Sequence, residues 1–262
     1  MKTFWVTVAL LAMTASAWGS YRNDAVEVQI KTDQGRELPF YPAKGDGRQQ
    51  TRLYAEAVKG DNYRIFIHNK TGRRVGVVVA VDGRNIISGQ KSWLKSNEQM
   101  YILEPYGSGE FTGWRSGDDK VNRFYFTTAD DSYAAAFNDE SALGVIAVAA
   151  FPEVRRVDPP VEFYREQSWR GAGAAAPSMA KQAKKAESMA DSAGTGYGHE
   201  EYSPVTRVEF EAEKTAMQKV LIKYEWRETL CQNGIISCRT PKHPGNRLWD
   251  NGGYAPPPPG RG

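Results

Sequence analysis

The 262-residue chain has few of the residues that build cross-linked or metal-rich proteins. Two cysteines are too few for a small domain held together by several disulfides, and three histidines offer little material for a hydrolytic or metal centre. Basic and acidic side chains, 34 and 31 in number, nearly cancel and leave a formal net charge of +3. This balance predicts neither a nucleic-acid partner nor binding to an anionic membrane surface.

The apolar run near the N-terminus is too short to cross a membrane, because a spanning helix needs roughly 20 apolar residues. Residues 4–13 are apolar apart from one threonine, Lys2 precedes them, and the small residues 15–17 follow. This order is typical of a secretory signal peptide, so we predict that residues 1–17 are removed on export. The alternative is an N-terminal core helix. We expect an extracytoplasmic protein, periplasmic or secreted, with no transmembrane span.

Export makes the two cysteines interpretable. Cys231 and Cys238 enclose six residues that include an Asn-Gly pair, which favours a turn able to bring the sulfur atoms together. In an oxidising compartment we predict a disulfide that stabilises the fold by roughly 2 to 3 kcal/mol. A zinc site that recruits His243 would lack a fourth ligand and the short spacing of common sites. We therefore expect no cofactor here.

Short stretches that alternate between apolar and polar residues predict β-strands between residues 24 and 165. Residues 26–30 show the alternation clearly, and residues 75–81 are nearly all apolar, which predicts a strand covered on both faces. The Asp-Gly pair at 82–83 favours a tight hairpin. No helical period separates these stretches, so we predict an all-β fold, an antiparallel β-sandwich. Further strands are expected at residues 53–57, 63–67, 100–103, 110–114, 123–127 and 143–151.

The composition changes after this domain. Residues 178–193 have small apolar residues at helical spacing, which predicts either a marginal helix or a disordered connector. Residues 205–210 and 220–224 are expected to be two strands that pair with the sandwich or with each other. The chain thus divides after the sandwich into an Ala/Gly-rich linker (166–200), a C-terminal strand pair with the disulfide loop (201–240) and a disordered Pro/Gly-rich tail (241–262).

Several short runs occur in one order along the chain: residues 82–87 (DGRNII), 104–106 (EPY), 131–135 (DSYAA) and 144–149 (GVIAVA), with the later 194–198 (GTGYG) and 202–205 (YSPV). Together these runs resemble a family of uncharacterised exported bacterial proteins. The resemblance extends from about residue 50 to 225 and implies a secreted bacterial context, but it implies no catalytic or binding residue.

Acidic and glycine-rich loops are the candidates for ion or substrate binding. Asp130 and Asp131 are adjacent loop acids that can bind Ca²⁺, or that can act with His68 in a hydrolase. Their simpler interpretation is that of solvated loop acids, and of a solvated strand residue for His68. Residues 194–198 lack the Gly-Lys-Ser/Thr ending of a phosphate loop, so we interpret them as a flexible turn.

Four aromatic residues are the candidates for partner binding. Trp93, Tyr101, Tyr106 and Trp114 lie within about twenty residues that also contain turn-forming Pro and Gly. Exposed on loops, such side chains suit contact with a sugar or a protein, because they combine a large apolar area with a polar edge. Packing in the core or under loops is the alternative, and the one we favour at this point.

These observations lead to three functional hypotheses. The first is a non-catalytic module of the bacterial envelope, binding another envelope protein or a surface polymer through its loops. The second is a secreted hydrolase of glycans or peptides that uses Asp130, Asp131 and His68. The third is a structural subunit whose C-terminal strands pair across chains. The oligomeric state stays open.

Overall fold

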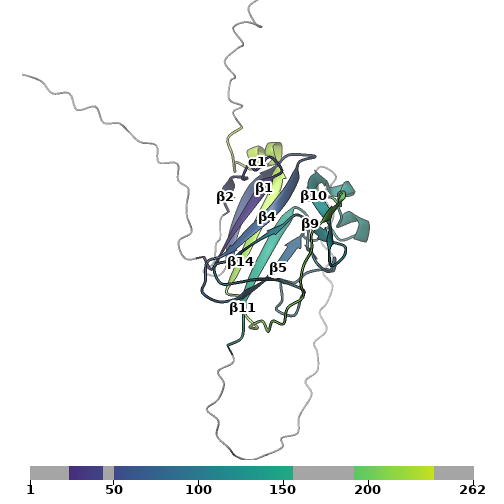
Figure 1. Ribbon diagram of the computed structural model, residues 1–262. Helices are drawn as coiled ribbons and strands as arrows, with labels where there is room; N and C mark the ends of the chain where they lie inside the picture. Colours follow the sequence, from purple (N-terminus) through teal and green to yellow (C-terminus); the bar gives the residue numbers. More distant parts are fainter. Residues whose placement is uncertain (1–23, 44–49, 156–191, 239–262) are drawn as a thin grey trace, which may run out of the picture.

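Two seven-stranded β-sheets pack face to face, which confirms the predicted all-β sandwich (Figure 1). The computed structural model describes residues 24–43, 50–155 and 192–238. The expected signal peptide, most of the expected linker and the expected tail lie outside these residues. Within the part of the chain that is described, no helix is long and apolar enough to cross a membrane.

The first sheet contains only antiparallel pairs. Its main path runs β1–β4–β10–β12, and three short strands add to β4 and β10. The strands are β1 (Val26–Thr32), β4 (Asn62–Asn69), β8 (Ser108–Phe111), β9 (Gly113–Arg115), β10 (Lys120–Thr128), β12 (Ala193–Thr195) and β13 (Glu200–Tyr202).

The second sheet is mixed, because β14 runs parallel to β3 and antiparallel to β11. Its path is β2–β3–β14–β11–β5–β6, with β7 also paired to β5. The strands are β2 (Phe40–Pro42), β3 (Gln50–Ala57), β5 (Val75–Val81), β6 (Arg84–Asn85), β7 (Tyr101–Leu103), β11 (Val145–Pro152) and β14 (Gln218–Trp226).

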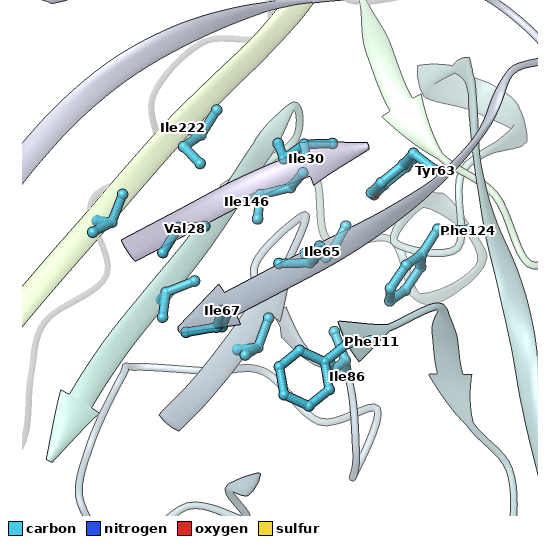
Figure 2. Close-up of a cluster of buried hydrophobic side chains, with 14 of the residues drawn as sticks. Val28, Ile30, Tyr63, Ile65, Ile67, Ile86, Phe111, Phe124, Ile146 and Ile222 are labelled. Carbon is cyan, nitrogen blue, oxygen red and sulfur yellow. The ribbon is translucent and has the colours of Figure 1, made fainter. Parts of the chain in front are cut away.

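The inward residues of both sheets form one hydrophobic core. Successive residues of a strand point to opposite faces, so Ile65 and Ile67 of β4 face inward while their neighbours face outward. Figure 2 shows these side chains beside Ile30 of β1, with Ile146 and Ile222 of the opposite sheet nearby. All five are fully buried, and burying such a side chain stabilises the fold by roughly 1.5 to 3 kcal/mol.

The apolar strand β5 is buried on both faces, as its composition predicts. Val77 and Val79 face the main core, whereas Val78 belongs to a smaller cluster on the outer face of the sheet. The segment 203–213 follows this outer face, where Phe210 lies over Gly76. This segment therefore provides the second cover that β5 requires.

The predicted hairpin after β5 is confirmed. Val81 pairs with Arg84, so Asp82 and Gly83 form a two-residue turn between β5 and β6. Both turn residues have positive φ angles, 49° and 77°. This conformation suits type I′ turns, in which Asp and Gly are favoured because they tolerate left-handed backbone.

The C-terminal part differs from the prediction in two ways. Residues 205–210 form no strand, and residues 193–195 of the expected linker form β12. The expected strand 220–224 is confirmed as part of β14, and of the two alternatives it pairs with the sandwich, inside the second sheet between β3 and β11. The sandwich is therefore built from strands on both sides of the expected linker, and the expected strand pair does not form.

The predicted disulfide joins Cys231 and Cys238, whose Cα atoms lie 5.0 Å apart. The helix α1 (Arg227–Gln232) carries the first cysteine, and its buried Leu230 anchors it beside β14. Gly234 has a positive φ of 69°, and its N–H donates to the carbonyl of Cys231. The Asn-Gly pair thus ends the helix and turns the chain back towards the second cysteine.

Candidate binding surface

The four aromatic candidates occupy different environments. Trp114 is buried, only 2% exposed, and its Nε1–H donates to the carbonyl of Gly196 at 3.0 Å. Tyr101 is partly buried, and its hydroxyl accepts a hydrogen bond from Arg115. Trp93 and Tyr106 are about two-thirds exposed, at 67% and 68%. Trp114 thus packs in the core, and only two of the four candidates, Trp93 and Tyr106, are exposed at the surface.

The two exposed candidates do not share one surface. The N–H of Tyr106 donates to the carbonyl of Thr71, near the start of β5. Trp93 follows Lys91, whose backbone pairs with that of Arg84 just after the end of β5. The seven residues of β5 separate these positions, a span of roughly 20 Å.

The acidic candidates and His68 are also apart. Asp130 and Asp131 are exposed on the short helical turn η1 (Ala129–Asp131), which follows the end of β10. Strand β4 runs antiparallel to β10, with Tyr63 opposite Phe124. His68, near the end of β4, therefore lies at the other end of the sheet, where it contacts Ser108. Among the described residues no group of three or more His, Cys, Asp or Glu side chains is placed to hold a metal ion.

A different group of aromatic residues does converge. Tyr133, Phe137 and Tyr197, here called the aromatic platform, come from two segments that are about sixty residues apart in the sequence. The rings of Tyr133 and Tyr197 are stacked with centroids 5.4 Å apart, and Phe137 meets Tyr133 edge-on at 5.0 Å. Phe137 and Tyr197 are 48% and 47% exposed. The ring of the buried Trp114 packs against that of Tyr133, with centroids 4.3 Å apart, and supports the platform from the core.

Backbone contacts hold the two platform segments side by side. The N–H of Tyr133 donates to the carbonyl of Thr195 at 2.8 Å, which ties the loop after β10 to β12. This loop, with its two short helical turns, lies at the edge of the molecule beside β9 and β10 (Figure 1). Phe137 ends the second turn, η2 (Ala135–Phe137).

The glycine-rich segment 194–198, interpreted from sequence as a flexible turn, is instead packed against β10. Gly194 and Gly196 are buried, and a Cβ at Gly196 would lie 2.1 Å from the ring of Tyr125. Because glycine has no side chain, the segment can lie flat on β10 and present Tyr197 at the surface. The glycines therefore position the platform.

A nearly buried cation lies under one ring of the platform. Arg84 is 8% exposed, and its guanidinium carbon lies 3.8 Å from the centre of the Phe137 ring. Its Nη1 donates to the carbonyl of Gly89, while its Nε has no hydrogen-bond partner. Within the described chain no carboxylate pairs with this guanidinium. A stacked cation of this kind is attracted to the face of the ring.

A second cation and aromatic pair lies next to the first. The ammonium of Lys91 lies 5.5 Å from the ring of Trp93 and 3.0 Å from the carboxylate of Asp139. Because the backbones of Lys91 and Arg84 pair, Trp93 extends the surface on which the platform lies. Of the four aromatic candidates, Trp93 is thus the one that belongs with this surface.

A buried polar network behind the platform links the two sheets. The carboxylate of Asp82 accepts hydrogen bonds from the N–H of Gly144 (2.8 Å), the N–H of Thr195 (2.7 Å) and the hydroxyl of Tyr224 (2.5 Å). The hydroxyl of Thr195 continues the network to Tyr63 at 2.8 Å. Since Thr195 also binds Tyr133, this network holds in place the strand on which the platform depends.

Asp82 has an unusual protonation behaviour because of this position. Burial raises the pKa of its carboxyl from 3.8 to about 6, and the donors from Tyr224, Thr195 and Gly144 offset part of that rise. Burial also raises the pKa of Tyr224 and Tyr63 well above 10.0. Sequence analysis identified Asp82 only as a turn residue. Its apolar surroundings, the strands 75–81 and 143–151, were the available signal that its carboxyl would be buried.

An open groove of about 930 Å³ lies elsewhere, between residues 96–104 and 205–212. Its charged side chains already have partners within the chain: Glu98 accepts from backbone amides of its own loop, and Asp118 pairs with Arg207. Arg115 is saturated by Tyr101 and by backbone carbonyls. Among the described residues that line the groove, no charged side chain is therefore left unpaired to orient a ligand.

Comparisons of the chain with models of protein families, with curated proteins and with solved structures found no match. The platform and its cations are accordingly interpreted from their own geometry.

Proposed function

We propose that this protein is an exported, non-catalytic module of the bacterial envelope that binds another protein through the aromatic platform. The observation that carries the proposal is the pair of half-exposed rings, Phe137 and Tyr197, held on Tyr133 and supported from the core by Trp114. Aromatic residues and arginine dominate the binding energy of protein interfaces, particularly where they are already rigid. The platform combines such rings with Arg84.

The arrangement of the rings favours a protein partner over a surface polysaccharide. A sugar chain stacks well on several rings that share one plane, but Phe137 is inclined by 69° to Tyr133. One face of Phe137 is covered by Arg84, and one face of Tyr197 is covered by Tyr133. The surface is therefore uneven, and each of the two rings offers its edge and one free face. Such a surface suits the irregular side chains of a protein.

Export is supported by two independent features. The N-terminal sequence has the order of a signal peptide, and the Cys231–Cys238 disulfide is of the kind that persists in oxidising compartments. The resemblance to exported bacterial proteins also supports a secreted bacterial context.

Site-specific photo-crosslinking in the native cell tests the binding site directly. A photoreactive phenylalanine analogue at position 137, and separately at 197, is expected to crosslink to one and the same protein. The matched control is position 202, where Tyr202 is even more exposed, at 74%, but belongs to β13 away from the platform. The crosslinked protein is then purified and titrated.

The titration decides the outcome. Phe137→Ser combined with Tyr197→Ser is expected to weaken binding of the purified partner at least tenfold, whereas Tyr202→Ser leaves it unchanged. Removing a central aromatic anchor commonly has an effect of this size. The proposal is wrong if positions 137 and 197 crosslink to no protein, if they crosslink to glycan instead, or if the control variant weakens binding equally.

A further inference from the structure

Arg84 carries a buried positive charge that has no counter-ion within the part of the chain that is described. A guanidinium that is more than nine-tenths buried loses most of its hydration, and such a group is normally paired with a carboxylate. Arg84 makes one hydrogen bond, to the carbonyl of Gly89, and stacks on Phe137. The other buried arginine among the described residues is paired: Arg123 contacts both Asp33 and Glu201.

Two acidic residues close to Arg84 in the fold are engaged elsewhere. Asp82, two positions earlier, turns its carboxylate into the core towards Gly144 and Thr195. Asp139 is engaged by Lys91 at 3.0 Å and by the hydroxyl of Ser141 at 2.6 Å. Neither acid pairs with Arg84, although both belong to segments that contact the platform.

One end of the guanidinium remains available. Nη1 is used by Gly89, and Nε is buried without a partner, whereas Nη2 makes no hydrogen bond within the described residues and is not among the buried unpaired atoms. The stacked Phe137 is half exposed, so a group that packs on the outer side of this ring comes close to the free end of Arg84.

Resting on the proposed function, we propose that the partner presents a carboxylate next to an apolar side chain, and that Arg84 binds this carboxylate while Phe137 and Tyr197 pack the apolar group. The partner supplies the counter-ion that Arg84 lacks among the described residues. A charge-assisted hydrogen bond between a guanidinium and a carboxylate is stronger than one between neutral groups, and the nearly buried position protects it from screening.

Random 12-residue peptides displayed on phage provide a defined probe. Selection on the full wild-type protein is expected to enrich peptides in which Asp or Glu lies beside an apolar residue. For a synthetic peptide from this selection, replacing its acidic residue by the matching amide is expected to weaken binding to the wild-type protein at least tenfold. Because the pair is nearly buried, the weakening should change little as the salt concentration rises.

Substitutions in the protein assign this effect to Arg84. Arg84→Gln is expected to bind the acidic peptide and its amide version equally, while Arg84→Lys retains part of the preference. Phe137→Ser is expected to abolish binding of both peptides. If Arg84→Gln does not fold, the acidic and amide peptides on the wild-type protein still decide the question.

The outcomes separate the two proposals. Peptides that need Phe137 but bind equally well as acid and amide overturn the assignment of Arg84 and leave the binding platform intact. A preference for the acid that persists in Arg84→Gln has the same meaning. If no selected peptide depends on Phe137, the proposed function itself fails.

Discussion

The buried carboxyl of Asp82 makes the stability of this protein depend on pH in an unusual direction. Most folded proteins contain carboxylates whose pKa is lowered, and they lose stability in acid. Asp82 has a raised pKa, about 6 in the folded protein against 3.8 in the unfolded chain, because burial outweighs the three hydrogen-bond donors. We predict that this group stabilises the fold most in acid, and that its contribution is lost as the pH rises through 6.

The magnitude follows from the size of the shift. Between the two pKa values the folded state binds more protons at Asp82 than the unfolded state does, so the free energy of unfolding falls with rising pH. A difference of about two pKa units corresponds to about 3 kcal/mol. Asp82→Asn removes the titration while keeping a residue that tolerates the positive φ of this turn.

Urea unfolding at a series of pH values from 4 to 7 measures the effect. The difference in unfolding free energy, wild type minus Asp82→Asn, is expected to decrease by about 2 kcal/mol over this range, because the unfolded carboxyl is already more than half ionised at pH 4. Asp139→Asn is the matched control: the hydrogen bond from Ser141 and the Lys91 ammonium lower the pKa of Asp139 below 3.8, so its difference should stay nearly constant above pH 4. A difference for Asp82 that is constant, or that grows with pH, would refute the reasoning.

Three further predictions concern the fold. Replacing both Cys231 and Cys238 by serine should lower the free energy of unfolding by about 2 kcal/mol, which urea unfolding measures; an unchanged midpoint would contradict the role of the disulfide. Gly113→Ala should destabilise the fold by about 2 kcal/mol or more, because a Cβ there would lie 2.1 Å from a backbone oxygen. The control Gly117→Ala, whose Cβ would have its nearest neighbour at 3.6 Å, should leave the thermal midpoint almost unchanged. Equal midpoints for the two variants would argue against the close approach at Gly113. A chain ending at residue 217 lacks β14 and should show no cooperative unfolding by circular dichroism, while one ending at 238 keeps every described strand; cooperative unfolding of the shorter chain would show that β14 is dispensable.

The alternation of residues predicted the strands of the first domain well, for a local reason. Val26, Val28 and Ile30 face the core because successive residues of a strand point to opposite sides, and the same rule places Ile65 and Ile67. The all-apolar strand 75–81 correctly indicated cover on both faces. What this rule does not contain is the identity of each strand's neighbour, so the place of β14 inside the second sheet could not be read from its pattern.

The binding surface was largely missed, and its parts show why. Trp93 was found because it lies in a loop rich in aromatic residues, but Tyr133, Phe137 and Tyr197 are spread over two segments with no motif in common. Residues 194–198 suggested a flexible turn because glycines favour turns, yet those glycines allow close packing on β10. No local rule distinguishes these two uses of glycine.

The amino-acid sequence by itself determined that the protein is a β-sandwich, where most of its strands lie, and that its two cysteines form a bridge. These properties depend on neighbouring residues, whose spacing sets side-chain direction and turn geometry. Only the tertiary structure decided that Asp82 is buried between the sheets and that Arg84 lies beneath Phe137 with no counter-ion among the residues that the structure describes. Such features arise when segments distant in the sequence meet, and the free energy of that meeting depends on the whole packed chain.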